Sequence, residues 1–85
     1  MYGIQFTRSA KKSFSKIAKQ EQVRIAKAIE KLAVDPTIGK PLQGVLKNHW
    51  SLRIGSYRVI YVIFKERLLV IVFDVGHRRE VYKER

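Results

Sequence analysis

The chain contains no cysteine, two histidines and seven acidic residues among its 85 positions. Without cysteine it forms neither a disulfide nor a thiolate metal site. The histidines, His49 and His77, lie too far apart for a metal-binding pattern, and the scattered acidic residues do not indicate a two-metal nuclease. Glycine-rich phosphate loops and hydrolase nucleophile motifs are also absent. We therefore expect a protein that uses no cofactor and no metal ion.

Long apolar runs are missing as well. None reaches the roughly 18 residues of a membrane span, and the N-terminal residues do not form the apolar segment of a secretory signal. We therefore expect a cytoplasmic protein without a membrane segment. With 46% apolar residues, positions 1–85 are predicted to form one small domain with its own core.

What the chain has in excess is positive charge. Eighteen Lys and Arg residues give a formal net charge of +11 and a pI of about 10.4. This charge favours a negative partner: nucleic acid first, an acidic protein second and an anionic membrane third. A basic surface that is simply solvated is the alternative interpretation.

The apolar pattern predicts the element order β-α-α-β-β-β. Residues with helical spacing form two stripes, and the second stripe ends at Asp35-Pro36 because the residue before proline avoids helical geometry. Residues 37–44 are predicted as a loop. The fold class is therefore α+β, with a helix hairpin packed on a small, mostly antiparallel sheet. The predicted elements are a strand at 2–6, a helix with the stripe Ala10, Phe14, Ile17 and Ala18, a helix at 20–34, and strands at 50–54, 57–65 and 68–75.

The clearest local signal is Gly55-Ser56, which separates two strand-like runs as a two-residue turn does. With this turn, Arg53 and Arg58 lie directly opposite each other on one face of a hairpin. Like charges in that arrangement destabilise an exposed pair by roughly 0.2–1 kcal/mol. A polyanion bound between the two guanidinium groups would offset this cost.

Arg58 also begins an apolar row on its strand, so its charge requires a partner. One interpretation is a salt bridge with Asp74 or Glu80. The other is a phosphate clamp, because the planar guanidinium fork matches two phosphate oxygens.

The register of the next hairpin, between the strands at 57–65 and 68–75, determines which residues lie near Arg53 and Arg58. If Phe64 pairs with Leu69, the register places Arg58 opposite Val75, and residues 76–79 emerge beside it. Arg53, Arg58 and Arg78 are then predicted to converge at one end of the sheet, with His77 and Tyr82 nearby.

These residues suit the cleavage of RNA without a metal ion, because the 2′-OH of RNA is an internal nucleophile. An enzyme must align that oxygen, neutralise the phosphate and move two protons. Arg53, Arg58 and Arg78 are candidates for neutralising the phosphate, and His77 or Tyr82 for moving protons. Alternatively His77 is simply exposed, while Tyr82 packs over the sheet edge or stacks on a base.

Further basic residues are predicted to contact the RNA backbone, through interactions that weaken steeply with salt. The alternative is a solvated lysine face. The candidates are Lys11, Lys12, Lys47 and Arg79.

Two motifs occur in order along the chain. They are Gly55-Ser56-Tyr57-Arg58-Val59-Ile60-Tyr61 and, one strand later, Val75-Gly76-His77-Arg78-Arg79-Glu80-Val81-Tyr82. Together they resemble the RelE branch of the RelE/ParE toxin superfamily, over nearly the whole chain. The resemblance implies a toxin that enters the ribosomal A site and cleaves mRNA there, giving a cyclic phosphate and a free 5′-OH. It also implies a RelB-like antitoxin that wraps the toxin and blocks the site, in a hetero-oligomer, whereas the free toxin is expected to be monomeric.

The resemblance implies roles for three residues. Arg58 matches a phosphate and transition-state contact. Arg78 matches a residue linked to leaving-group stabilisation or proton transfer, and Tyr82 matches a tyrosine that stacks on the cleaved nucleotide.

Three other positions depart from the family pattern. Arg53 stands where RelE has a lysine proposed as a base or phosphate contact, and Ser51 stands where RelE has a second lysine. His77 replaces a further lysine and is a candidate for the proton carrier.

Two other functions stay open. A ParE-like toxin has the same fold but poisons DNA gyrase without catalysis, and it has no need of the set Arg58, Arg78 and Tyr82. The other possibility is a basic RNA- or ribosome-binding module, or a toxin that has lost its activity.

Overall fold

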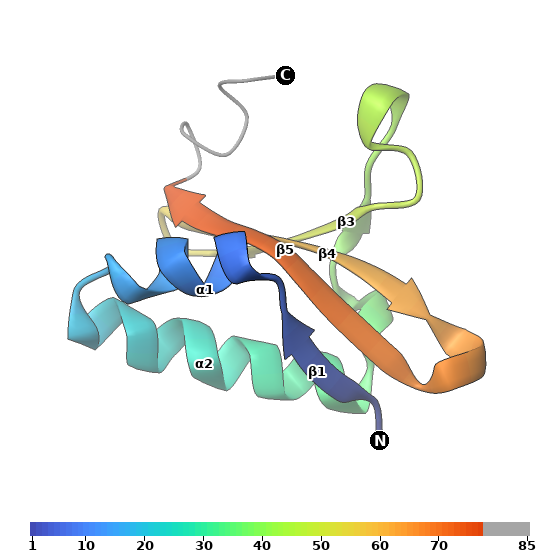
Figure 1. Ribbon diagram of the computed structural model, residues 1–85, viewed down its shortest axis with the longest axis horizontal. Helices are drawn as coiled ribbons and strands as arrows, with labels where there is room; N and C mark the ends of the chain where they lie inside the picture. Colours follow the sequence, from blue (N-terminus) through green and yellow to red (C-terminus); the bar gives the residue numbers. More distant parts are fainter. Residues whose placement is uncertain (78–85) are drawn as a thin grey trace.

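The structure, a computed structural model, describes residues 1–77. Its elements are β1 (Gly3–Phe6), α1 (Arg8–Ser15), α2 (Lys19–Val34), β2 (Lys40–Pro41), β3 (Trp50–Ile54), β4 (Tyr57–Phe64) and β5 (Leu69–His77), with 3₁₀ turns at Pro36–Ile38, Gly44–Leu46 and Lys65–Arg67. The five strands form one sheet in the order β1-β5-β4-β3-β2, and both helices lie on the same side of it (Figure 1). Strand β1 is parallel to β5, and all other neighbours are antiparallel. The predicted α+β fold with a helix hairpin on a mostly antiparallel sheet is confirmed.

The prediction of a continuous loop over residues 37–44 is wrong at one place. Lys40 and Pro41 pair with Ser51 and Trp50 and form the short edge strand β2. A strand of two residues has no alternating pattern to reveal it, and proline is tolerated there because the strand lies at the sheet edge.

In the described part of the chain, no helix combines the length and the apolar character that a membrane-spanning helix needs.

Helix α1 is bounded by local hydrogen bonds. The Oγ1 atom of Thr7 accepts a hydrogen bond from the backbone N–H of Ala10 at 3.1 Å and caps the start of the helix. The helix ends at Ser15, earlier than its apolar stripe suggests. The backbone N–H of Ile17 bonds to the carbonyl of Phe14 at 3.1 Å, three residues back, in a tighter final turn. Ile17 still packs against the core from this turn.

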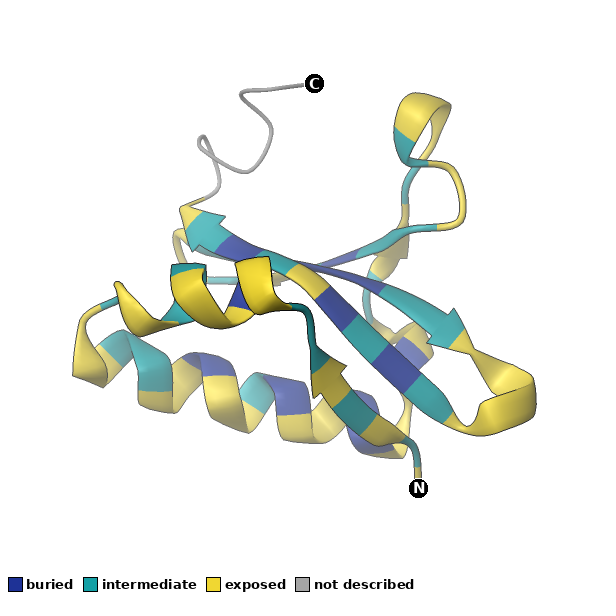
Figure 2. Ribbon diagram, viewed as in Figure 1, coloured by how far each residue is buried: buried dark blue, intermediate teal, exposed yellow. Residues whose placement is uncertain are grey.

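The core is a single layer between the helices and the sheet. Figure 2 shows buried positions recurring along α2 and through the middle of β4 and β5. On the sheet face away from the helices, Ile60 is buried as well, at 1% exposed. The residues of the cluster between the helices and the sheet come from both helices and from the strand positions that face them. They are Ala10, Ile25, Ile29, Leu32, Val59, Tyr61, Val70, Val72 and Val75.

The turn after α2 is fixed against the sheet by hydrogen bonds. The Asp35 carboxylate accepts hydrogen bonds from the hydroxyl and backbone N–H of Thr37, which lower the pKa of this carboxyl below its ordinary value. The buried hydroxyl of Tyr61 donates to the carbonyl of Pro36 at 2.6 Å, and burial raises the pKa of Tyr61 to about 12. At Gly39, a Cβ atom would lie 2.6 Å from the carbonyl oxygen of Ser51, so only glycine fits this crossing without a shift.

The register between β4 and β5 differs from the prediction at one end. Phe64 pairs with Leu69 as predicted, but Arg58 lies opposite Gly76 and not opposite Val75. The predicted pairing of Arg58 with Val75 is therefore wrong by one residue.

A β-bulge causes this shift. It adds Phe73 to β5, so that Val72 and Asp74 pair with neighbouring residues of β4. The bulge reverses the alternation of β5. It places Val75 in the core, where it is 1% exposed, and keeps Asp74 out of it. Without the extra residue, the aspartate would face the helices and the valine would face away from them.

Candidate functional site

Two arginines lie side by side on the sheet face that points away from the helices, which we call the open face. Gly55 has the positive φ of 58° that suits the tight turn, and Arg53 pairs directly with Arg58. Alternate residues of β3 and β4, such as Leu52 and Val59, point into the core. Both arginine side chains therefore project from the opposite, open face. The predicted pairing of like charges is confirmed.

The two arginines differ in how firmly they are held. The Nη1 atom of Arg58 donates a hydrogen bond to the Oγ atom of Ser51 at 3.1 Å. Ser51 is only 4% exposed, and its strand is paired on both sides, with Lys40 and with Ile60. Arg58 is half-buried against this fixed hydroxyl, whereas Arg53 is exposed. One guanidinium is thus preorganised, and the other can move to meet a ligand.

The alternative salt bridge of Arg58 with Asp74 is not formed. Asp74 pairs with Ile60 one row away, and within residues 1–77 Arg58 is bonded to Ser51 and not to this carboxylate. The other predicted partner, Glu80, lies outside the described residues.

His77 lies at the same end of the sheet as the arginine pair but on its other face. It is directly opposite Tyr57, and the two rings meet edge to face with their centroids 5.9 Å apart. Tyr57 packs against the core, so this pair lies on the helix side. Together with Ser13 and Lys16 of the α1 region, the two rings line a hollow of about 600 Å³ at the end of β5. The bulge explains this placement, because the predicted register would have turned His77 to the open face.

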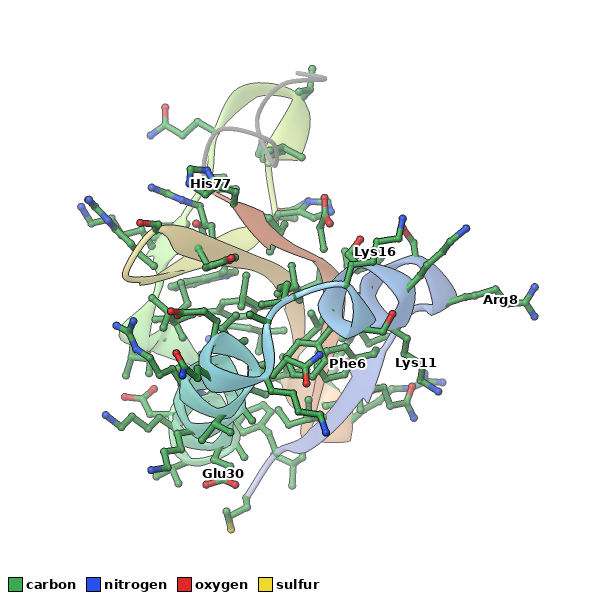
Figure 3. All side chains as sticks on the ribbon, turned by 90° about the vertical axis from the view of Figure 1, so that its left-hand side faces the viewer. Phe6, Arg8, Lys11, Lys16, Glu30 and His77 are labelled. Atoms are coloured by element: carbon green, nitrogen blue, oxygen red, sulfur yellow. The ribbon has the colours of Figure 1, made fainter. Side chains whose placement is uncertain are left out.

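The predicted RNA-binding lysines lie on two separate surfaces. Lys11 and Lys12 are exposed on α1, and Lys47 is exposed beside the turn Gly44–Leu46. Figure 3 shows Lys11 projecting from α1 on the side away from His77. The remaining predicted site residues, Arg78, Arg79 and Tyr82, lie outside the described part of the chain.

A loop crosses the open face beside the arginine pair. The ring of His49 lies 5.5 Å from the ring of Phe73, the residue that the bulge adds to β5. Since β3 and β5 are separated by β4, this contact carries the end of the loop over the central strand. The arginine pair therefore lies on a sheet face that this loop partly covers.

A family model described as the ParE toxin of type II toxin–antitoxin systems matches residues 4–82. The chain belongs to the RelE/ParE family of type II toxins. The toxin is 31% identical to toxin RelG of Mycobacterium tuberculosis over 84 residues, which cover 96% of this chain and 97% of RelG. The predicted membership of the RelE/ParE superfamily is confirmed.

Solved structures give the same assignment. The toxin matches a chain of the toxin–antitoxin complex RelBE2 of Mycobacterium tuberculosis with a TM-score of 0.84 and 32% identity, covering 91% of this chain and 98% of that one. It matches the isolated RelE toxin of Escherichia coli with a TM-score of 0.80 and 27% identity, covering 99% and 94% of the two chains.

Sequence reasoning missed the part that Ser51 plays in this toxin. The serine follows Trp50 in an apolar strand, and nothing local marks it as a partner of an arginine. Its position opposite Ile60 could have been read from the hairpin register, since diagonal neighbours on one face lie within reach of a long side chain.

Proposed function

We propose that this toxin is a ribosome-dependent endoribonuclease that cleaves mRNA in the ribosomal A site. The observation that carries the proposal is the arginine pair, in which Arg58 is held by Ser51 while Arg53 stays exposed beside it. Two like charges directly opposite each other on neighbouring strands fit a phosphodiester whose negative charge increases in the transition state. The similarity to RelG and RelE supports the same activity.

In the proposed reaction, the 2′-OH attacks the adjacent phosphorus and the 5′-oxygen of the next nucleotide leaves. This gives a cyclic phosphate and a free 5′-OH, and no metal ion is needed. Arg58 binds the phosphate oxygens through its preorganised fork, and Arg53 adds a second positive charge as negative charge builds up on them. Arginine is a poor base, since its pKa stays above about 12, so other groups must move the protons.

Proton transfer is assigned to the phenol of Tyr82, which also lies against the nucleotide at the cleavage point in this proposal, while Arg78 stabilises the charge on the leaving 5′-oxygen. His77 is a weaker candidate for the proton carrier, because its ring meets Tyr57 on the helix side of the sheet. We assign His77 instead to contacts with RNA as it passes the end of β5.

A site that is strong in charge and poor in acid–base groups depends on external alignment of its substrate. The ribosome supplies this by holding the mRNA in a fixed conformation. Lys11, Lys12, Lys47 and Arg79 are proposed to contact RNA phosphates around the site, with affinity that falls as salt rises. A RelB-like antitoxin is the proposed partner, because the structural match is to a toxin held in a RelBE2 complex.

A second candidate function is the poisoning of DNA gyrase without catalysis. The observation that favours it is the family model, which is described as a ParE toxin. Such a toxin would use the basic surface for binding alone, and its toxicity would not depend on the hydrogen bond between Arg58 and Ser51.

Expression without an antitoxin separates the two functions. Wild type and Arg58→Ala are induced, growth is followed, and cellular mRNA is mapped by primer extension while plasmid supercoiling is analysed on gels. Cuts within translated codons that disappear in Arg58→Ala support the nuclease. Growth arrest with no cuts and with lost supercoiling supports the gyrase poison instead.

A further inference from the structure

The half-buried His49 lies on the open face, in the loop that precedes β3. Three contacts hold it there. Its backbone N–H donates to the carbonyl of Leu46, and its own carbonyl accepts from the N–H of Leu42, both at 2.9 Å. Its ring meets the ring of Phe73 with the centroids 5.5 Å apart. The imidazole is therefore positioned by the fold before any ligand arrives.

A fourth contact determines which nitrogen of the ring carries the proton. The Nδ1 atom of His49 lies 3.3 Å from the carbonyl oxygen of Lys47. A carbonyl oxygen only accepts hydrogen bonds, so this contact places the proton of the neutral ring on Nδ1. The other nitrogen, Nε2, then carries a lone pair, and within residues 1–77 it has no hydrogen-bond partner. His49 is thus arranged to accept a proton.

The guanidinium of Arg58 lies on the same face and extends toward His49. Arg58 leaves its strand opposite Arg53, but its Nη1 atom is bonded to Ser51, two residues closer to the histidine. His49 precedes Ser51 by another two residues, which places the two backbones about 7 Å apart along one face. The phosphate-binding fork and the imidazole are therefore neighbours.

The contact with Phe73 brings the imidazole back over the central strand. Phe73 is the extra residue of the bulge and precedes Asp74, which pairs with Ile60. Ile60 is also the residue opposite Ser51. It is only 1% exposed although it points away from the helices, as expected when side chains converge over it. Arg58 and His49 approach this point from opposite ends.

We propose that the Nε2 atom of His49 is the general base that removes the proton from the 2′-OH of the mRNA. This inference rests on the proposed nuclease function, in which the phenol of Tyr82 supplies one proton and no residue has yet been assigned to remove the other. His77 does not suit this role, because its ring meets Tyr57 on the helix side of the sheet. His49 lies on the face that carries the arginine pair.

The step balances with these two groups. As the bond between O2′ and phosphorus forms, the hydroxyl proton passes to Nε2 of His49. As the bond between phosphorus and O5′ breaks, the leaving oxygen takes the proton of the Tyr82 phenol. Arg58 binds the phosphate oxygens between them. Both proton carriers return to their starting forms by exchange with water, so no metal ion or co-reactant is consumed.

His49→Asn separates a catalytic role from a structural one. The amide N–H of asparagine can still donate to the Lys47 carbonyl, but the side chain offers no basic nitrogen. Single-turnover cleavage of mRNA on purified ribosomes with an open A site is expected to slow by about 100-fold. The affinity for the ribosome and the unfolding midpoint should stay close to those of wild type.

Chemical rescue tests the same nitrogen without relying on the loop. In His49→Gly, added imidazole is expected to raise the cleavage rate by about tenfold or more, because it supplies the missing base. The matched control is Arg58→Ala, which keeps His49. Its residual rate should not respond to imidazole.

Each contrary result has a separate meaning. If wild type cleaves mRNA and His49→Asn cleaves at the same rate, His49 is not the base, while the proposed nuclease stands. A rate of His49→Gly that imidazole does not raise also overturns the base. If wild type makes no cuts on programmed ribosomes, the proposed nuclease fails, and the base fails with it.

Discussion

The Nη1 atom of Arg58 lies 3.1 Å from the Oγ atom of Ser51, and this hydrogen bond makes two adjacent arginines unequal. Ser51 is buried in a strand that is paired on both sides, so its hydroxyl is a fixed acceptor. Arg58 is therefore held before any ligand arrives, whereas Arg53 remains exposed. Preorganised charge of this kind stabilises a transition state without reorganisation during the reaction.

Ser51→Ala tests the positioning role of the serine. We expect the single-turnover rate of mRNA cleavage on ribosomes to fall about tenfold, because the Arg58 fork loses its fixed orientation. The apparent affinity for the ribosome should not change. Ser51→Thr keeps the hydroxyl and should restore most of the rate. If Ser51→Ala and Ser51→Thr lose the same fraction of activity, the hydroxyl does not act through Arg58.

Arg53→Gln is predicted to stabilise the free toxin while reducing its activity. Removing one of two directly opposed like charges should raise the free energy of unfolding by about 0.2–1 kcal/mol at low salt. The gain should shrink as added salt screens the pair. Urea unfolding at two salt concentrations measures this, and Arg67→Gln, on the β4–β5 turn, is the matched control. A loss of stability in Arg53→Gln would show that the pair is not repulsive.

Gly39→Ala is predicted to destabilise the fold. The added methyl group would approach both the Tyr61 hydroxyl and the Ser51 carbonyl, at 2.6 Å from the latter, so the turn after α2 must shift at a cost of about 1–3 kcal/mol. Gly3→Ala meets only ordinary contacts, the nearest at 3.7 Å, and should stay within about 0.5 kcal/mol of wild type. Equal unfolding midpoints for these two variants would refute the close crossing at Gly39.

Much of the fold was predictable from the sequence, and the exceptions have physical causes. Helical spacing and the Gly55-Ser56 turn depend on local patterns, so the helix hairpin and the Arg53–Arg58 pair could be predicted. The bulge at Phe73 depends on a choice between burying Val75 and burying Asp74, which local alternation does not reveal. The face on which His77 lies follows from that one extra residue.

The role of Ser51 in the candidate site was also not predictable from local sequence patterns. Its neighbours along the chain are apolar or aromatic, and its role arises from a strand that returns nine positions later at Ile60. The roles that depend on residue type could be predicted. The roles that depend on the exact register between strands, such as those of Ser51 and His77, could not.

Tyr61 should make stability depend on alkaline pH. Burial raises its pKa from an ordinary value of 10.0 to about 12 in the folded toxin. Because the folded state holds this proton more tightly than the unfolded state, the contribution is complete below about pH 10 and is lost as pH rises toward about 12. Tyr61→Phe should remove this part of the pH dependence and cost about 1 kcal/mol through the lost bond to Pro36. Parallel unfolding curves for wild type and Tyr61→Phe between these pH values would contradict the prediction.

The most direct test of the account compares wild type with Arg58→Lys in single-turnover cleavage of mRNA on purified ribosomes programmed with an open A site. Lysine keeps the positive charge but lacks the planar fork. The cleavage rate is expected to fall by about 100-fold or more, while ribosome binding stays within about twofold of wild type. A cleavage rate equal to that of wild type would contradict it, because Arg58 would then contribute charge alone and its preorganisation by Ser51 would have no role in the reaction.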